Sequence, residues 1–138
     1  MSTEENKSIM RRGYEALNQR NFSFFDEMCT PDFVFHYASR KIEGPEAFKQ
    51  FLSMWSNAFP DLHFTVDDIV AEGDMVVVRH TAHGTHQGEL MGIPSTGKRV
   101  TTTGIVICHV MNGKAVEEWM NADTLGILQQ IGAIPSMG

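Results

Sequence analysis

The residues best suited to chemistry lie near the end of the chain, in the segment 115–123. If this segment is a strand, residues of equal parity share a face, and one face carries Glu117, Trp119, Asn121 and Asp123. An aromatic ring, an amide and two acids suit a pocket that has a few polar groups in an apolar wall. A desolvated carboxylate there can act as a general acid or base, which makes Asp123 the first catalytic candidate.

Asp123 has a second role open to it. The sequence DTLG, which begins at Asp123, suits the start of a helix, and Asp is a preferred N-cap residue. Spacing alone does not separate a helix cap from a catalytic acid, so both interpretations stand.

The hairpin at Asn112 and Gly113 decides whether His109 joins this face. A two-residue loop pairs His109 with Val116 and turns it to the opposite face. A three-residue loop that includes Met111 puts it on the same face as the acid. Both loops are common for Asn-Gly. The other interpretation is that His109 is a partly buried histidine whose ring nitrogens are hydrogen-bonded by a neighbouring residue.

Three more histidines crowd the segment RHTAHGTHQG: His80, His83 and His86. On a strand, His83 has the opposite parity, so the three cannot converge on a metal without a bulge. No acid or cysteine completes a ligand set with a recognisable spacing. We therefore expect no metal site, and we expect His80 and His86 to line the pocket.

Two further polar side chains can reach such a pocket. His36 lies on an early strand, where a solvent-exposed edge position is the alternative, and Tyr14 lies in the first helix, where core packing is the alternative. The glycines of GIPSTGK lack the phosphate-loop spacing, so that segment is expected to be a surface loop and no nucleotide cofactor is expected.

Helices come first in the chain and strands follow. Capping residues and apolar spacing predict a helix at the start, and Pro45 favours the start of another. Helices are expected over 2–20, 22–29, 45–58 and 123–133, and strands over 32–38, 63–73, 74–88, 98–111 and 114–122. The piece 39–44 is expected to be a turn. This order predicts an α+β fold in one domain over residues 1–138, with helices on one face of a curved antiparallel sheet.

Composition narrows the class of protein. The chain has 138 residues, a net charge of -6 and no dense basic cluster, which argues against nucleic acid as a partner. No window approaches a membrane span, and the polar start resembles neither a signal nor a transit peptide. Two cysteines without a CxxC motif favour free thiols in the cytoplasm.

Apolar residues of both parities occur in MVVVRH and GIVICHVM. A sheet with one solvated face would alternate more cleanly, so we expect the outer face to be covered by a second copy in a homodimer.

Taken together, GTHQGE, GIPSTGK, GIVICHVMNGKAVEEW and DTLGILQQIGA resemble the SnoaL-like polyketide cyclases, also called ester cyclases, of the NTF2-like fold group. The resemblance covers nearly the whole chain. It implies a cone-shaped α+β barrel in which a bent antiparallel sheet wraps around N-terminal helices and a cavity.

The resemblance also implies a site and a reaction. The acid after the tryptophan strand matches Asp123 as the general acid/base, and the histidine of the preceding strand matches His109, which favours the three-residue loop. The reaction would be an intramolecular aldol ring closure on a small hydrophobic or aromatic substrate, without a cofactor.

Two other functions stay open. A ketosteroid-isomerase-like enzyme would place one acid in the first strand and another in the strand before the late hairpin. In this chain, the strand before that hairpin contains no acid. A non-catalytic ligand carrier or dimerising module would use the same fold, because fold does not give function.

Overall fold

The structure is a computed structural model that describes residues 2–135. Helices and strands alternate unevenly, with three of the four helices near the start. The helices are α1 (Thr3–Gln19), α2 (Phe24–Met28), α3 (Pro45–Ala58) and α4 (Thr124–Gln130). The strands are β1 (Cys29–Tyr37), β2 (Arg40–Glu43), β3 (His63–Glu72), β4 (Met75–Thr85), β5 (Arg99–Met111) and β6 (Lys114–Ala122).

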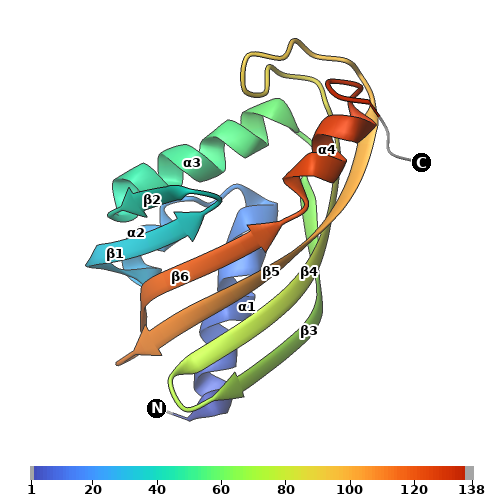
Figure 1. Ribbon diagram of the computed structural model, residues 1–138. Coiled ribbons are helices and arrows are strands. Elements are labelled where there is room, and N and C mark those ends of the chain that lie inside the picture. The colour runs from blue at the N-terminus through green and yellow to red at the C-terminus, as the bar shows by residue number, and fades with distance from the viewer. Residues whose placement is uncertain (1, 136–138) are drawn as a thin grey trace.

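The strands form one bent sheet in the order β2-β1-β6-β5-β4-β3. In Figure 1, α1 crosses behind the sheet, α3 lies beside β1 and β2, and α4 follows the end of β6. This confirms the predicted α+β class with helices packed on a bent sheet. Two details differ: residues 40–43 form a strand rather than a turn, and β1 pairs with β6 in parallel. That pairing joins segments far apart in the chain, which no local pattern reveals.

The helix ends follow from local chemistry. Ser2 caps α1, because its hydroxyl accepts a hydrogen bond from the Glu5 N–H while the Glu5 carboxylate accepts one from the Ser2 N–H. Gly44, with φ of 88°, lets the chain turn sharply into α3, and Pro45 begins that helix at a position where its missing N–H costs nothing.

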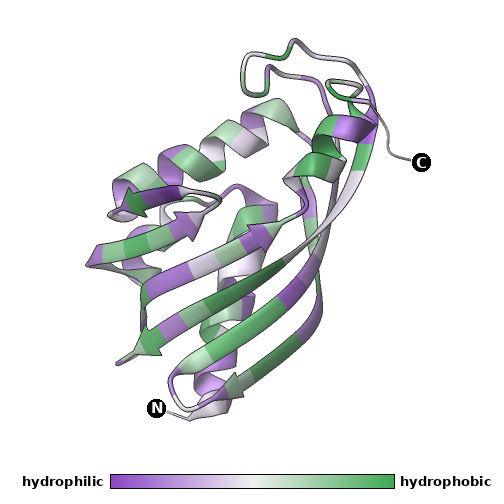
Figure 2. Cartoon of the chain, viewed as in Figure 1, coloured by the Kyte–Doolittle hydropathy of each residue, from purple (hydrophilic) through white to green (hydrophobic). Residues whose placement is uncertain are grey.

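Side chains alternate between the two faces of the long strands. On β4 and β5, buried residues such as Val76, Val78, Val106 and Cys108 face the helices, and their neighbours face outward. Figure 2 shows the resulting alternation of hydrophobic and hydrophilic bands along the strands. The core therefore lies between the concave face of the sheet and the helices.

The β5–β6 hairpin combines a tight turn with a bulge. Asn112 and Gly113 both have positive φ, at 52° and 80°, as a two-residue hairpin loop requires. Beyond the turn, β6 contains an extra residue at Val116, so that His109 pairs with Glu117 instead of Val116. The bulge thereby puts His109 on the same face as Glu117 without a three-residue loop.

Candidate active site

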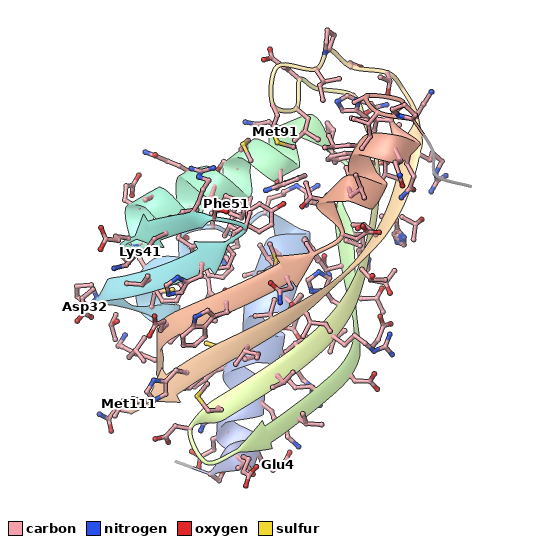
Figure 3. All side chains as sticks on the ribbon, viewed as in Figure 1. Glu4, Asp32, Lys41, Phe51, Met91 and Met111 are labelled. Atoms are coloured by element: carbon pink, nitrogen blue, oxygen red, sulfur yellow. The ribbon has the colours of Figure 1, made fainter. Side chains whose placement is uncertain are left out.

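A cavity lies between the helices and the concave face of the sheet. Aromatic and aliphatic side chains make up most of its wall, as expected of a small-molecule site. Phe51, labelled in Figure 3, extends from α3 toward the sheet, and its ring centroid lies 5.2 Å from that of Phe35 on β1. The apolar lining residues include Met10, Leu17, Phe25, Met28, Phe35, Phe48, Phe51, Phe59, Phe64, Val106 and Met120.

Glu118 contributes the only carboxyl group among the described residues that line this cavity. Its side chain comes from β6, is 7% exposed, and lies across from Cys108 on β5 and Phe35 on β1. Burial raises the pKa of Glu118 to about 8, and a hydrogen bond with the Cys108 thiol offsets only part of that rise. A carboxyl group with such a pKa can both take and return a proton near neutral pH.

Tyr14 and His80 form a hydrogen-bonded pair in the same wall. The Tyr14 hydroxyl oxygen lies 2.7 Å from His80 Nδ1, and both side chains are buried. Burial lowers the pKa of His80 to about 4 and raises the pKa of Tyr14 above its ordinary value, so both groups are neutral at pH 7. Gly104 makes room for the imidazole, because a Cβ there would lie 2.6 Å from His80 Nε2.

The residues that the sequence grouped around Asp123 share one face, but it is the outer face of the sheet. His36 stacks on Trp119, with ring centroids 5.4 Å apart, and its Nε2 lies 2.6 Å from a carboxylate oxygen of Glu117. Asn121 is exposed, and none of these side chains lines the cavity. The expectation that Trp119, Asn121 and His36 line the pocket is therefore wrong for this chain.

His109 and Asp123 also lie outside the cavity lining. His109 pairs with Glu117 on the outer face. Asp123 is exposed, and its Oδ1 accepts a hydrogen bond from the N–H of Gly126, which caps α4. The expectation that both side chains face the cavity is wrong. Cys108 and Glu118 are the paired residues that turn inward on β5 and β6, and Asp123 lies beyond the end of β6.

His86 is buried elsewhere. Its Nδ1 lies 2.9 Å from the Thr96 hydroxyl and accepts a weaker bond from the Thr96 N–H, which ties the two ends of the loop 86–98 together. The ring packs against Phe59 rather than lining the cavity, which corrects the expectation for this residue. Within residues 2–135, no group of three or more His, Cys, Asp or Glu side chains is arranged to hold a metal ion.

The sequence contains one signal that points to Glu118. Glu118 alternates with Met120 and Ala122, so an isolated acid occupies an otherwise apolar strand face. A charged residue on such a face is rarely buried without a reason, and this signal could have identified the acid of the cavity.

Comparisons with known proteins place this chain in a family. A family model described as SnoaL-like polyketide cyclase matches residues 7–131. DnrD of Streptomyces peucetius, named as an aklanonic acid methyl ester cyclase, is 29% identical over 93 residues, which are 67% of this chain and 64% of DnrD. The match thus spans less than two thirds of that relative. DauD of Streptomyces sp. strain C5, which has the same name, is 29% identical over 130 residues, 90% of this chain and 80% of DauD.

Solved structures give the same fold. AclR of Streptomyces galilaeus, named as a candidate hydroxylase, superposes with a TM-score of 0.90 at 30% sequence identity. The superposition covers 99% of this chain and 87% of AclR. Within residues 2–135, no helix is both long and apolar enough to cross a membrane.

Proposed function

Because this chain belongs to the SnoaL-like polyketide cyclase family, we propose that it closes a ring in a small hydrophobic substrate by an intramolecular aldol reaction. The observation that carries this proposal is a single buried carboxyl group, Glu118, in a largely apolar cavity. Aklanonic acid methyl ester, on which DnrD and DauD are named to act, is the first candidate substrate.

Glu118 is the acid/base group of the proposed reaction. Its carboxylate takes a proton from a carbon next to a substrate carbonyl, and the electron pair of that C–H bond moves into an enolate. The enolate carbon attacks a second carbonyl of the same molecule, a C–C bond forms, and the carbonyl π electrons move to oxygen. Glu118 returns its proton to that oxygen, so the step balances without an oxidant, a reductant or a cofactor.

The raised pKa of Glu118 supports this role, because a base whose pKa lies near the working pH combines adequate strength with a useful ionised fraction. The apolar wall adds proximity by holding the two reacting carbons of a folded substrate together. Tyr14 and His80 supply the neighbouring polar groups, and we propose that they stabilise the oxygen on which negative charge develops.

We propose that Asp123 serves α4 as its N-cap rather than the reaction. Its exposed carboxylate and its hydrogen bond with the Gly126 N–H support that role. An exposed carboxylate lacks the desolvation that would strengthen it as a base.

The similarity to AclR makes hydroxylation the rival activity. Incubation of the purified protein with aklanonic acid methyl ester, followed by liquid chromatography and mass spectrometry, separates the two. Aldol ring closure yields an isomer of the substrate or the isomer less one water, whereas hydroxylation adds an oxygen atom. A product with added oxygen, or the absence of a product with every ketone ester offered, would overturn the proposed reaction.

We also propose that the chain forms a homodimer through the outer face of its sheet. Several large apolar side chains are exposed there in the single chain, and we call these residues the outer strip. They are Met75, Ile105, Ile107, Met111 and Trp119. Exposed apolar patches of this kind are characteristic of interaction sites, and a twofold partner would cover the strip with its own copy.

The proposed compartment is the cytoplasm. Both cysteines, Cys29 and Cys108, are buried free thiols, and a reducing compartment preserves thiols in that state.

A further inference from the structure

Two polar atoms in the cavity wall have no hydrogen-bond partner among the described residues. They are Nε1 of Trp55 on α3 and Oγ1 of Thr102 on β5, and both atoms are buried. A buried donor without a partner costs free energy, because the chain gives up a bond to water and gains nothing in return. Such atoms in a ligand cavity indicate that the bound ligand supplies the partner.

Both residues adjoin the same small apolar cluster at one end of the cavity. Trp55 packs against a small apolar cluster that contains Phe59, Ile127 and Val100, and Val100 is the neighbour of Thr102 on the inner face of β5. The ring of Trp55 stacks on that of Phe59 with centroids 6.4 Å apart, and it also meets the rings of Tyr37 and Phe51 of the main core, each at 6.3 Å.

Glu118 lies toward the other end. It pairs with Cys108, which is six residues along β5 from Thr102. Six residues of extended strand span at most about 20 Å. Between the two ends the wall presents apolar side chains such as Val106 and Met120, together with the Tyr14–His80 pair, in which the Tyr14 hydroxyl bonds to His80 Nδ1.

We propose that Trp55 and Thr102 form a subsite that hydrogen-bonds a carbonyl oxygen of the ligand. An indole N–H can only donate, and a threonine hydroxyl can donate as well, so the two together suit an acceptor such as a ketone, quinone or ester oxygen. The ligand class is therefore a cyclic or polycyclic ketone with an apolar body. The position of its reacting carbon at Glu118 rests on the proposed function, whereas the subsite itself does not.

The subsite also predicts selectivity. A hydrocarbon of the same shape would leave both donors buried and unpaired, and sites built around hydrogen bonds reject such analogues far more strongly than they reject a change of one methylene. The subsite would hold an elongated substrate in one orientation, with its acceptor oxygen away from Glu118.

The test compares the binding of 2-tetralone with that of tetralin, the hydrocarbon with the same two-ring skeleton but no oxygen. Dissociation constants are measured by ligand-observed nuclear magnetic resonance for the wild type and for the double variant Trp55→Phe/Thr102→Val. The wild type should prefer the ketone by about tenfold or more, and the double variant should lose that preference while its affinity for tetralin stays unchanged.

Matched variants guard against general damage. Thr102→Ser keeps the hydroxyl and should keep the preference. Trp119→Phe and Thr101→Val make the same replacements at exposed positions outside the cavity lining and should change neither affinity. Unfolding curves check that each variant folds. Equal binding of the two ligands by the wild type, or a preference that survives in the double variant, would overturn the subsite.

The same measurement on Glu118→Gln separates the subsite from the proposed function. The ketone preference should persist in that variant, because both donors of the subsite stay in place. Loss of the preference in Glu118→Gln alone would place the selective contact at Glu118 and overturn the subsite. An intact preference in a protein that closes no ring would instead overturn the proposed function.

Discussion

The hydroxyl oxygen of Tyr14 lies 2.7 Å from Nδ1 of His80, and both side chains are buried in the wall of the cavity. One partner comes from the first helix and the other from β4, which are 66 residues apart in the chain. The pair therefore ties α1 to the sheet at the point where the site is formed.

Replacement of Tyr14 by Phe should destabilise the protein by about 1–3 kcal/mol, because it leaves a buried nitrogen of His80 without its partner. Urea unfolding at pH 7 measures this loss. Tyr37→Phe is the matched control, since its hydroxyl bonds to Thr124 in a partly buried position and its removal should cost less. Equal stability of Tyr14→Phe and the wild type would mean that the pair contributes nothing to the fold.

The contribution of Glu118 to the stability of the protein should fall as the pH rises from about 4.5 to about 8. In that window the folded state keeps the proton on Glu118, whose pKa is raised to about 8, while the unfolded chain has released it. The loss is on the order of 5 kcal/mol and is complete above pH 8. Glu118→Gln removes this titration, so urea unfolding should show the variant gaining on the wild type between pH 5 and pH 9. A constant difference between the two proteins across that range would contradict the buried acid.

His80 titrates between about pH 4 and pH 6.5 and acts in the opposite direction, so in the wild type it offsets the Glu118 trend in that range. Its pKa is lowered to about 4 in the folded state, so the unfolded chain binds the proton first and stability is lost as the pH falls below about 6.5. Glu118→Gln keeps this loss, which identifies it as a separate titration.

The helix cap gives a prediction for Asp123. Asp123→Asn should leave stability nearly unchanged, because Asn is also a good N-cap, whereas Asp123→Ala should cost about 1 kcal/mol. Thermal unfolding of the two variants measures the difference. If the Asn variant lost as much stability as the Ala variant, the charge rather than the cap would explain the acid at this position.

The proposed dimer predicts that Ile107→Asp yields a monomer. Ile107 is 37% exposed on β5 in the single chain, next to Trp119 of the neighbouring strand, so a charge there would be buried at the interface. Light scattering at micromolar concentration measures the mass. Thr101→Asp, on the same strand but outside the outer strip, should remain a dimer. A monomeric wild type would remove the proposal.

Much of the fold could be predicted because its signals are local. Ser2 and Pro45 mark helix starts, and Asn112-Gly113 marks a hairpin, all within a few residues. The parallel pairing of β1 with β6 could not be predicted, since it depends on how distant segments pack.

The site was harder to predict for a related reason. The face of each β6 residue follows from parity, but which face meets the helices depends on the whole sheet. The bulge at Val116 adds to this, because it separates Ala115, which is fully buried, from Glu117 and Trp119, which face outward. Simple alternation puts all three on one face, and the expectation for Trp119 therefore assigns the pocket to the wrong side of the strand. Tyr14 and His80 lie in the cavity lining, but strand parity alone assigns His86 there as well, so it does not separate the two histidines.

The most direct test of the central claim is proton abstraction itself. The α-protons of aklanonic acid methyl ester, the candidate substrate, exchange with deuterium in D₂O, and nuclear magnetic resonance measures how far the protein accelerates that exchange. If Glu118 is the base, the wild type accelerates exchange increasingly up to about pH 8, Asp123→Asn does the same, and Glu118→Gln loses the acceleration by about 100-fold or more. Acceleration that survives in Glu118→Gln, or that disappears in Asp123→Asn, would contradict the assignment of the cavity acid as the catalytic base.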